Sequence, residues 1–391
     1  MTMKIMIVGW YGTETIGDRA ILAGIFRFLK ISFGNFEVNL GSLYPFFTRR
    51  TIDEDYSFWE KTCACPLSVR IFDSKKSEDL HKAIMDSDMV IMGGGPLMHI
   101  RAMFMVEYAF KTAKKYGKKT VLAGCGVGPI FYEKFKKSLI NISKSSDLIL
   151  LRDSLSKRYL DNIFHEYGTI LEKPIYLGLD PAVQCALNFN QLYREYTNSN
   201  IISINLRSFP EEYRKDKKEI NINKKLCEFI DSLSLLFSKN DILLVPMHYF
   251  HIGKDDREFL NQIKFSLNRS NIRVQNSHLS MLETMHVYSQ AQYNIGMRFH
   301  SVLLQTIVNG KNFVLDYTEP GKGKIAGFLK DIDSSGFYSD RYICLQEDHI
   351  TSDKISIESL SESFSGNNTF IQDRLRVYTD CLRDIYENKS Q

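Results

Sequence analysis

Short apolar runs alternate with longer stretches of helical periodicity along most of this chain, and this rhythm constrains the fold more than any other feature. The runs Lys4–Val8, Met89–Met92 and Thr120–Ala123 each precede a glycine-bearing loop and an amphipathic stretch. Strands buried in parallel sheets have continuous apolar sequences, and each parallel connection needs a crossover, usually a helix. The first half of the chain therefore predicts a parallel sheet with helices on both faces.

A second set of strands follows a polar stretch at Asn188–Asn200, where we place a domain boundary. With 391 residues, the chain is long enough for two domains of ordinary size. We expect a Rossmann-like domain over residues 1–190, a second over 198–350, and a C-terminal helix within 365–391 that packs back on the first domain. The strands predicted in the second half are Ile201–Leu206, Ile242–Pro246, Tyr293–Ile295 and Asn312–Asp316.

The composition excludes several classes of protein. A formal net charge of +4 is too small to indicate a nucleic-acid partner. No segment approaches the ~20 apolar residues that span a bilayer. The seven cysteines are scattered, and the close pair Cys63-Ala-Cys65 has neither a redox nor a zinc spacing. We expect free thiols, no bound metal and a cytoplasmic location.

Glycine-rich segments follow three of the predicted strands. Gly9–Asp18, which includes Gly12, fits either a ligand loop before a positive helix end or a tight turn with Asp18 as a helix cap. It lacks the G-x-G-x-x-G dinucleotide pattern. The run Gly93-Gly94-Gly95 favours a binding loop, because each glycine costs conformational entropy. We expect a turn at Gly124–Pro129, whose glycines fit a binding loop, although less strongly, or close packing.

The most informative motif is Arg298-Phe299-His300, which follows a predicted strand. In extended backbone, Arg298 and His300 point to one face and Phe299 to the other. A helix predicted at Val302–Val308 begins directly afterwards. An arginine, a histidine and a positive helix end would then converge on one point, which suits a phosphorylated or carboxylated ligand.

Three further features leave alternatives open. Lys322 and Lys324 lie among glycines after a strand and form either a phosphate site or a solvated loop. His248, His251 and the acidic pair Asp255-Asp256 fit contacts with sugar hydroxyls or helix capping, and capping is favoured for the acidic pair. The stretch Lys111–Lys144 holds nine lysines against one acid, and it fits a solvated face or peripheral contact with anionic lipid.

In their order and context, these motifs resemble the polysaccharide pyruvyl transferase family over roughly Lys4 to Leu329. The resemblance implies a GT-B-like fold, in which two Rossmann-type parallel-sheet domains face an interdomain cleft. The segments that carry it are Gly9…Gly12…Gly17-Asp18, Gly93-Gly94-Gly95, Gly124…Gly128-Pro129, Arg152-Asp153…Ser156, Asp180-Pro181-Ala182, Asn205-Leu206-Arg207, Pro246-Met247-His248 with Asp255-Asp256, Arg298-Phe299-His300 and Lys324…Gly327-Phe328.

The resemblance also assigns roles to single residues. Arg298 and His300 match the Arg-x-His motif of the donor site, with His300 as the proton-transfer candidate. Lys322 is the alternative to Lys324, because this lysine loop carries extra residues. The donor-binding candidates are Arg152, Arg207, Lys324 and Lys322. The candidates for acceptor binding or loop roles are Gly12, Asp18, Gly93, Gly94, Gly95 and His248.

The implied reaction transfers pyruvate from phosphoenolpyruvate to two hydroxyls of a sugar, which forms a cyclic ketal and releases phosphate. Phosphoenolpyruvate is a co-substrate, so we expect no cofactor. The family implies a polyprenyl-diphosphate-linked oligosaccharide as acceptor, at the inner face of the cytoplasmic membrane, in capsule or exopolysaccharide synthesis. Two alternatives are a GT-B glycosyltransferase that uses a nucleotide sugar and a non-catalytic sugar-binding assembly protein.

Overall fold

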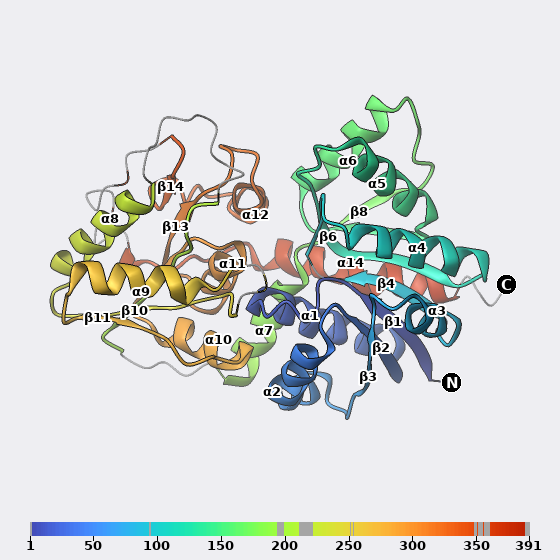
Figure 1. Cartoon of the computed structure of the whole chain (residues 1–391), viewed down its shortest axis with the longest axis horizontal. Helices are drawn as coiled ribbons and strands as arrows, with labels where there is room; N and C mark the ends of the chain where they lie inside the picture. Colours follow the sequence, from blue (N-terminus) through green and yellow to red (C-terminus); the bar gives the residue numbers. More distant parts are fainter. Residues whose placement is uncertain are drawn as a thin grey trace. The chain divides into compact units, whose positions relative to one another are not determined.

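The chain folds into two compact α/β units in a computed structural model (Figure 1). Unit 1 comprises Met1–Glu14, Asp18–Cys185 and Thr369–Gln391, and unit 2 comprises Thr15–Gly17 and Ala186–Asn368. The structure describes residues 2–93, 95–193, 199–210, 222–250, 252, 254–347, 350, 355 and 360–387.

Unit 1 is built on a parallel sheet in the order β3-β2-β1-β4-β6-β7-β8, with β5 paired to β6. Every strand pair in it is parallel. The strands are β1 (Met3–Val8), β2 (Phe36–Ser42), β3 (Ser68–Asp73), β4 (Met89–Gly93), β5 (Pro96–Leu97), β6 (Lys119–Val127), β7 (Leu148–Leu151) and β8 (Ile175–Leu177). The helices are α1 (Ile16–Phe33), α2 (Pro45–Cys63), α3 (Ser77–Met85), α4 (Met103–Lys115), α5 (Glu133–Ser145), α6 (Ser154–Glu166) and α14 (Asn368–Glu387). Helix α7 (Pro181–Tyr193) begins in unit 1 and continues into unit 2 from Ala186.

The core of unit 1 lies on both faces of its sheet. On one face, Met92 packs in a cluster with Phe110 of α4 and Leu139 of α5. On the other face, Phe28 of α1 stacks on Tyr378 of α14, with ring centroids 4.3 Å apart. Burying one such side chain contributes about 1.5–3 kcal/mol relative to leaving it exposed. The sequence of β4 is apolar throughout because both of its faces are covered.

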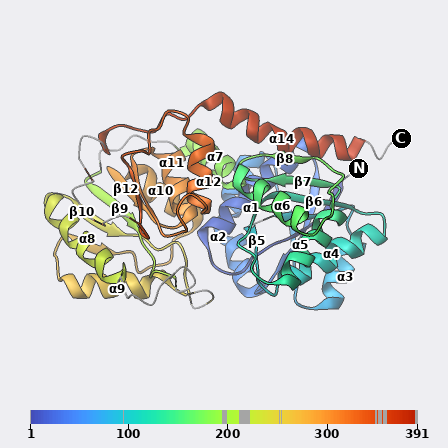
Figure 2. The ribbon, with the colours of Figure 1, turned by 90° about the horizontal axis from the view of Figure 1, so that it is seen from above.

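Unit 2 has a six-stranded parallel sheet in the order β11-β10-β9-β12-β13-β14. Helix α11 contacts α12 and β13, and α11 and α12 lie close together in both views of the molecule (Figure 1 and Figure 2). The strands are β9 (Ile201–Asn205), β10 (Asp241–Leu244), β11 (Ile272–Val274), β12 (Tyr293–Gly296), β13 (Asn312–Asp316) and β14 (Tyr342–Cys344). The helices are α8 (Ile222–Leu236), α9 (Asp256–Leu267), α10 (Met281–Gln290), α11 (Phe299–Val308) and α12 (Lys324–Ile332).

The prediction of parallel sheets covered by helices is confirmed, and two details of it were wrong. The turn predicted at Gly124–Pro129 starts too early, because β6 continues to Val127. The register of β6 on β7 shifts between Ala123 and Cys125, and Gly124 has the positive φ of 69° at this irregularity. Glycine inside a strand therefore marks a bulge here and not the end of the strand.

The polar stretch that begins at Asn188 is helical up to Tyr193, as the last part of α7. Phe189 in this stretch is buried and meets His286 edge-on, with ring centroids 4.9 Å apart. One buried aromatic residue therefore anchors a helical segment that also contains the polar residues Asn188, Asn190 and Gln191. Among the described residues, no helix has the length and apolar character needed to cross a membrane.

Candidate active site

Three neighbouring strands of unit 2 carry polar side chains just beyond their carboxyl ends. Asn205 at the end of β9 pairs in register with Gly296 at the end of β12. Arg207 and Arg298 each follow two residues later, so they stand at equivalent positions on adjacent strands. Tyr317 comes directly after β13, the next strand in the sheet. Ligands of parallel α/β sheets bind at this edge.

Arg298 is held by a two-pronged ion pair. Its Nε and Nη2 donate to Asp256 Oδ2 and Oδ1 at 2.7 and 2.5 Å. The Arg298 side chain retains 16% of its exposure, whereas Asp256 is buried. Burial lowers the pKa of Arg298, but the Asp256 carboxylate outweighs burial and raises it. The guanidinium is thus a fixed cation with its fork locked in one orientation.

Asp256, which the sequence offered as a contact for sugar hydroxyls or as a helix cap, is a structural partner of Arg298. Its Oδ2 also accepts the backbone N–H groups of Met247 and His248, each at 3.1 Å. Its neighbour Asp255 is the N-cap of α9 and accepts from Arg257 N at 2.9 Å. The capping interpretation is confirmed for Asp255 but not for Asp256, which joins the loop after β10 to Arg298.

Tyr317 lies among three cationic side chains. The Arg207 guanidinium carbon is 5.3 Å from the Tyr317 ring centroid. Burial raises the pKa of Tyr317, but Lys324, Arg207 and Arg298 together outweigh burial and Asp316, so the net pKa is lowered. A site that favours the phenolate has a positive potential, which also favours a bound anion.

The pKa of Arg207 is lowered on balance, whereas that of Arg298 is raised, although Tyr317 hydrogen-bonds to Arg207. Burial lowers the pKa of Arg207, and the neighbouring charge of Arg298 lowers it further. Among the described residues, its buried Nε has no hydrogen-bond acceptor. A buried donor without an acceptor is costly, so Arg207 is suited to receive an oxyanion.

The structure separates the two candidate lysines. Lys324 begins α12, contributes to the potential at Tyr317, and has its Nζ 5.8 Å from the Phe299 ring centroid. Lys322 has a side chain that is 70% exposed, and its Nζ donates to Glu319 Oε1 at 3.0 Å. Lys324 therefore belongs to the cationic cluster, whereas Lys322 forms a surface ion pair.

The extended backbone predicted for Arg298-Phe299-His300 was wrong beyond Arg298. Arg298 is the N-cap of α11, with φ −76° and ψ 144°, and the helix begins at Phe299. Burial of Phe299, Val302 and Leu303, spaced as one helical face, explains the early start. His300 thus sits in the first turn of α11, so its direction follows from helix geometry and not from strand alternation.

His300 is packed against the segment Thr15–Gly17, which belongs to unit 2. Ile16 N donates to Met247 O at 3.1 Å, and Thr15 forms an antiparallel bridge with His248. A Cβ added at Gly17 would lie 1.9 Å from His300 Nδ1. Glycine is therefore required at position 17 by the imidazole, a role that the sequence motif did not indicate. His248 itself is buried and contributes its backbone to this arrangement, and His251 lies outside the described residues.

The remaining predicted site residues lie in unit 1 and have packing roles there. Arg152 is buried, and its Nη1 donates to Asp180 Oδ2 at 3.0 Å. Asp18 lies in the first turn of α1, where its Oδ2 accepts from Thr13 Oγ1 at 3.3 Å, so it is not the terminal cap residue. Arg152 is thus an internal ion-pair residue of unit 1, and its predicted contact with a donor stays a prediction.

The glycine loops of unit 1 are explained by close backbone packing. Gly12 has φ +86°, and a Cβ there would lie 2.7 Å from Tyr44 O. A Cβ at Gly93 would meet Ile25, and one at Gly95 would lie 2.4 Å from Trp10. Gly94 lies outside the described residues. At Gly95 the positive φ of 75° and the Trp10 ring both favour glycine, so glycine content by itself does not demonstrate a binding loop here.

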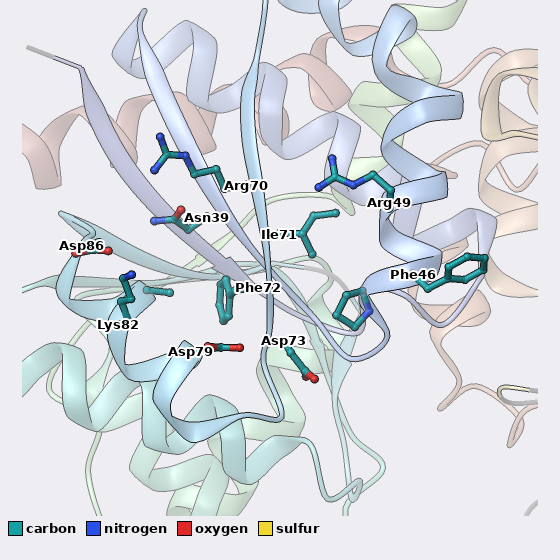
Figure 3. A pocket seen from close by; sticks show the side chains of 12 residues that line it. Asn39, Phe46, Arg49, Arg70, Ile71, Phe72, Asp73, Asp79, Lys82 and Asp86 are labelled. Carbon is teal, nitrogen blue, oxygen red and sulfur yellow. The ribbon is translucent and has the colours of Figure 1, made fainter.

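One cavity of about 670 Å³ opens around the edge strand β3 of unit 1. Figure 3 shows side chains from α2 and α3 flanking this strand. Three basic and three acidic side chains line it, so it has no net preference for an anion. None of the predicted site residues is among its lining residues, which are Asn39, Pro45, Phe46, Arg49, Arg70, Ile71, Phe72, Asp73, Asp79, Lys82, Ala83 and Asp86.

The described residues contain no cluster of three or more His, Cys, Asp or Glu side chains that could hold a metal ion.

Solved structures with a similar fold are carbohydrate enzymes of low sequence identity. A UDP-GlcNAc 2-epimerase from Neisseria meningitidis, bound to UDP-GlcNAc, aligns with a TM-score of 0.61 and 13% identity over 97% of this chain and 99% of that chain. A protein from Listeria monocytogenes, assigned as a UDP-N-acetylglucosamine 2-epimerase, aligns with a TM-score of 0.63 and 10% identity over 99% of this chain and 98% of that chain. A glycosyltransferase from Rickettsia africae aligns with a TM-score of 0.51 and 15% identity over 98% and 99% of the two chains.

These neighbours show the fold, which is GT-B-like. No curated protein sequence matches the chain. The family model described as polysaccharide pyruvyl transferase matches residues 16–319. This span runs from the segment that packs on His300 to the loop after Tyr317, and it includes Arg207, Asp256 and Arg298. The chain therefore belongs to the polysaccharide pyruvyl transferase family and is a transferase.

Proposed function

We propose that this protein transfers the pyruvyl group of phosphoenolpyruvate to two hydroxyls of one sugar, forming a cyclic ketal and releasing phosphate. The observation that carries the proposal is the set of three cations around Tyr317. Phosphoenolpyruvate has a carboxylate and a phosphate on a three-carbon frame, so a compact site with several cations suits it. Membership of the family supports the transfer of a pyruvyl group.

The cationic cluster supplies different kinds of anion contact. Arg298 is oriented by Asp256, and arginine binds a carboxylate or phosphate through two parallel hydrogen bonds. Arg207 offers a buried Nε donor, and Lys324 adds a point charge at the start of α12. The N-terminus of α11, next to His300, adds the partial positive charge of unpaired helix amides.

The chemistry requires proton transfer but no redox step. One sugar hydroxyl oxygen adds to the carbon that bears phosphate while the methylene carbon takes up a proton and becomes a methyl group. The C–O bond to phosphate breaks, and the second hydroxyl closes the ring. One of the two hydroxyl protons ends on the methyl carbon, and the other ends on the released phosphate. We assign proton exchange to His300, because imidazole exchanges protons near neutral pH.

We further propose a lipid-linked sugar as acceptor, at the inner face of the cytoplasmic membrane. The lysines between residues 111 and 144 give this proposal limited support, because several of them are paired. Lys111 bonds to Glu107, Lys114 to Asp147, and Lys136 to Glu166. These three acids lie outside residues 111–144 in the sequence but next to the lysines in space. The surface is therefore less basic than the count of lysines in the sequence indicated. The donor proposal does not depend on the acceptor's lipid.

The test is binding followed by product analysis. Isothermal titration should detect phosphoenolpyruvate binding and no binding of UDP-N-acetylglucosamine. Phosphate release with a panel of lipid-linked and nitrophenyl sugars should be accompanied by a ketal methyl signal in the product NMR spectrum. Arg298→Lys should weaken phosphoenolpyruvate binding about tenfold, because a point charge does not replace the paired fork.

Two results would redirect the assignment. Binding of UDP-N-acetylglucosamine without phosphoenolpyruvate would favour a nucleotide-sugar glycosyltransferase. Carbohydrate binding that persists in His300→Ala, without phosphate release by the wild-type protein, would favour a non-catalytic sugar-binding protein.

A further inference from the structure

A second group of side chains that could bind a ligand lies in unit 1, beyond β5 and β6. It consists of aromatic side chains gathered around His99. The His99 ring centroid is 5.1 Å from that of Phe131, 5.9 Å from Tyr132 and 6.4 Å from Phe135. Phe104 stacks on Phe135 at 5.0 Å. Phe131 and Tyr132 are 67% and 60% exposed, although large aromatic side chains are normally buried.

The backbone that carries the exposed rings is anchored. Ile130 is buried, its N–H donates to Tyr159 Oη at 2.7 Å, and its carbonyl accepts from the same hydroxyl at 3.0 Å. Gly128 N donates to Leu97 O at 2.8 Å. Phe131 and Tyr132 therefore project from a segment that is fixed on its N-terminal side. Rigid aromatic side chains lose little conformational entropy on binding, which is why they serve as anchors in binding sites.

His99 places a polar atom in the middle of this aromatic surface. Its Nδ1 lies 2.8 Å from Pro129 O. A carbonyl only accepts, so Nδ1 carries the proton of this bond, and in the neutral imidazole Nε2 is left as an acceptor. The cluster thus combines flat apolar rings with one oriented hydrogen-bond acceptor.

The position of the cluster is that of a ligand site. His99 follows β5, and Phe131 and Tyr132 follow β6, so all three lie beyond the carboxyl ends of parallel strands. Ligands of open parallel sheets bind at this edge. The cationic cluster of Arg207, Arg298 and Lys324 lies in unit 2. Among the described residues, no other ligand has been assigned to unit 1.

We infer that His99, Phe131 and Tyr132 form a carbohydrate-binding platform that takes one hexopyranose ring. A pyranose has an apolar C–H face, which packs on aromatic rings, and a rim of hydroxyl donors, one of which His99 Nε2 accepts. A lipid interior or an apolar protein surface would cover this acceptor without supplying a donor, which is costly. Assigning the bound sugar as the acceptor substrate rests on the proposed function; the sugar binding itself does not.

Saturation-transfer NMR tests the platform on the protein of residues 1–391 with methyl β-D-glucopyranoside and methyl β-D-galactopyranoside. We expect at least one glycoside to bind through its ring C–H protons. Phe131→Ala and Tyr132→Ala should each weaken that binding about tenfold. His99→Asn keeps a donor for Pro129 O but lacks the Nε2 acceptor, and it should weaken binding to a similar degree. Phe265→Ala is the matched control, because Phe265 is an 80% exposed phenylalanine in unit 2.

The outcomes separate this inference from the donor proposal. Absence of glycoside binding, or binding that all three platform variants leave within twofold of wild type, overturns the platform. Binding to phosphatidylglycerol vesicles that Phe131→Ala abolishes, without glycoside binding, shows a membrane surface and also overturns it. Phosphoenolpyruvate binding, measured by calorimetry, should be the same in these variants as in the wild-type protein. If the wild-type protein does not bind phosphoenolpyruvate, only the donor proposal is contradicted.

Discussion

Arg298 and Asp256 are 42 residues apart in sequence, and they meet through two hydrogen bonds of 2.7 and 2.5 Å. The same carboxylate binds two backbone amides of the loop after β10. One acidic side chain thus connects the start of α9, that loop and the arginine of the Arg-x-His motif. The position of Arg298 within the cationic cluster depends on this connection.

Asp256→Asn should destabilise the protein by about 3 kcal/mol, because it leaves the partly buried Arg298 without its counter-charge. Urea unfolding measures this change in free energy of unfolding. Asp255→Ala is the control, since it removes a helix cap and should cost about 1 kcal/mol. Equal losses in the two variants would show that the ion pair has no special role.

Tyr317 should titrate below the ordinary range of tyrosine. The absorbance difference between wild type and Tyr317→Phe should show phenolate forming at lower pH than in free tyrosine. Lys324→Met should move this transition upward, because it removes one of the cations that lower the pKa. A phenolate repels a second anion, so phosphoenolpyruvate affinity should fall as pH rises through the pKa of Tyr317. A transition at or above pH 10 would contradict the described electrostatics.

Lys324→Met should weaken phosphoenolpyruvate binding about tenfold or more, since a charged hydrogen bond contributes about 1.5–3 kcal/mol. Lys322→Met should change it less than twofold, because the ion pair of Lys322 with Glu319 lies at the surface. Isothermal titration on both variants measures the contrast. The reverse order of effects would make Lys322 the donor contact.

Gly17→Ala should lower turnover about 10²-fold, because the added Cβ displaces the His300 imidazole and misplacement of about 1 Å has this effect. Gly34→Ala is the matched control. Gly34 has φ +69° with nothing near its missing Cβ, so its replacement should cost about 1 kcal/mol of stability and leave turnover unchanged. Normal turnover in Gly17→Ala would indicate that His300 can move without consequence.

His300→Ala should lose about 10²–10⁴-fold in turnover while retaining phosphoenolpyruvate binding, as expected for a general acid or base. His81→Ala, which alters a histidine in unit 1 that contacts Tyr108, controls for loss of any imidazole. Steady-state phosphate release and calorimetry separate the two effects. Lost binding with unchanged turnover at saturation would make His300 a binding residue only.

Several elements were predictable because their information is local. The strand Asn312–Asp316 occurs with the predicted bounds, and the predicted run Lys4–Val8 lies within β1. Burial on both faces of a parallel sheet demands continuous apolar sequence, which identifies such strands without their neighbours. The predicted start of α11 was wrong because both an extended and a helical backbone at Arg298–His300 fit the local sequence pattern. Burial of Phe299 decided between them.

The sequence by itself determined the α/β class, the presence of two parallel sheets and the position of Arg298 beyond the end of a strand. These follow from periodicity, which each segment carries alone. Only the tertiary structure decided that Asp256 orients Arg298, that Lys324 and not Lys322 joins Tyr317, and that Gly17 makes room for His300. Those relationships join segments up to some hundreds of residues apart, and they depend on strand order and register, which no local pattern encodes.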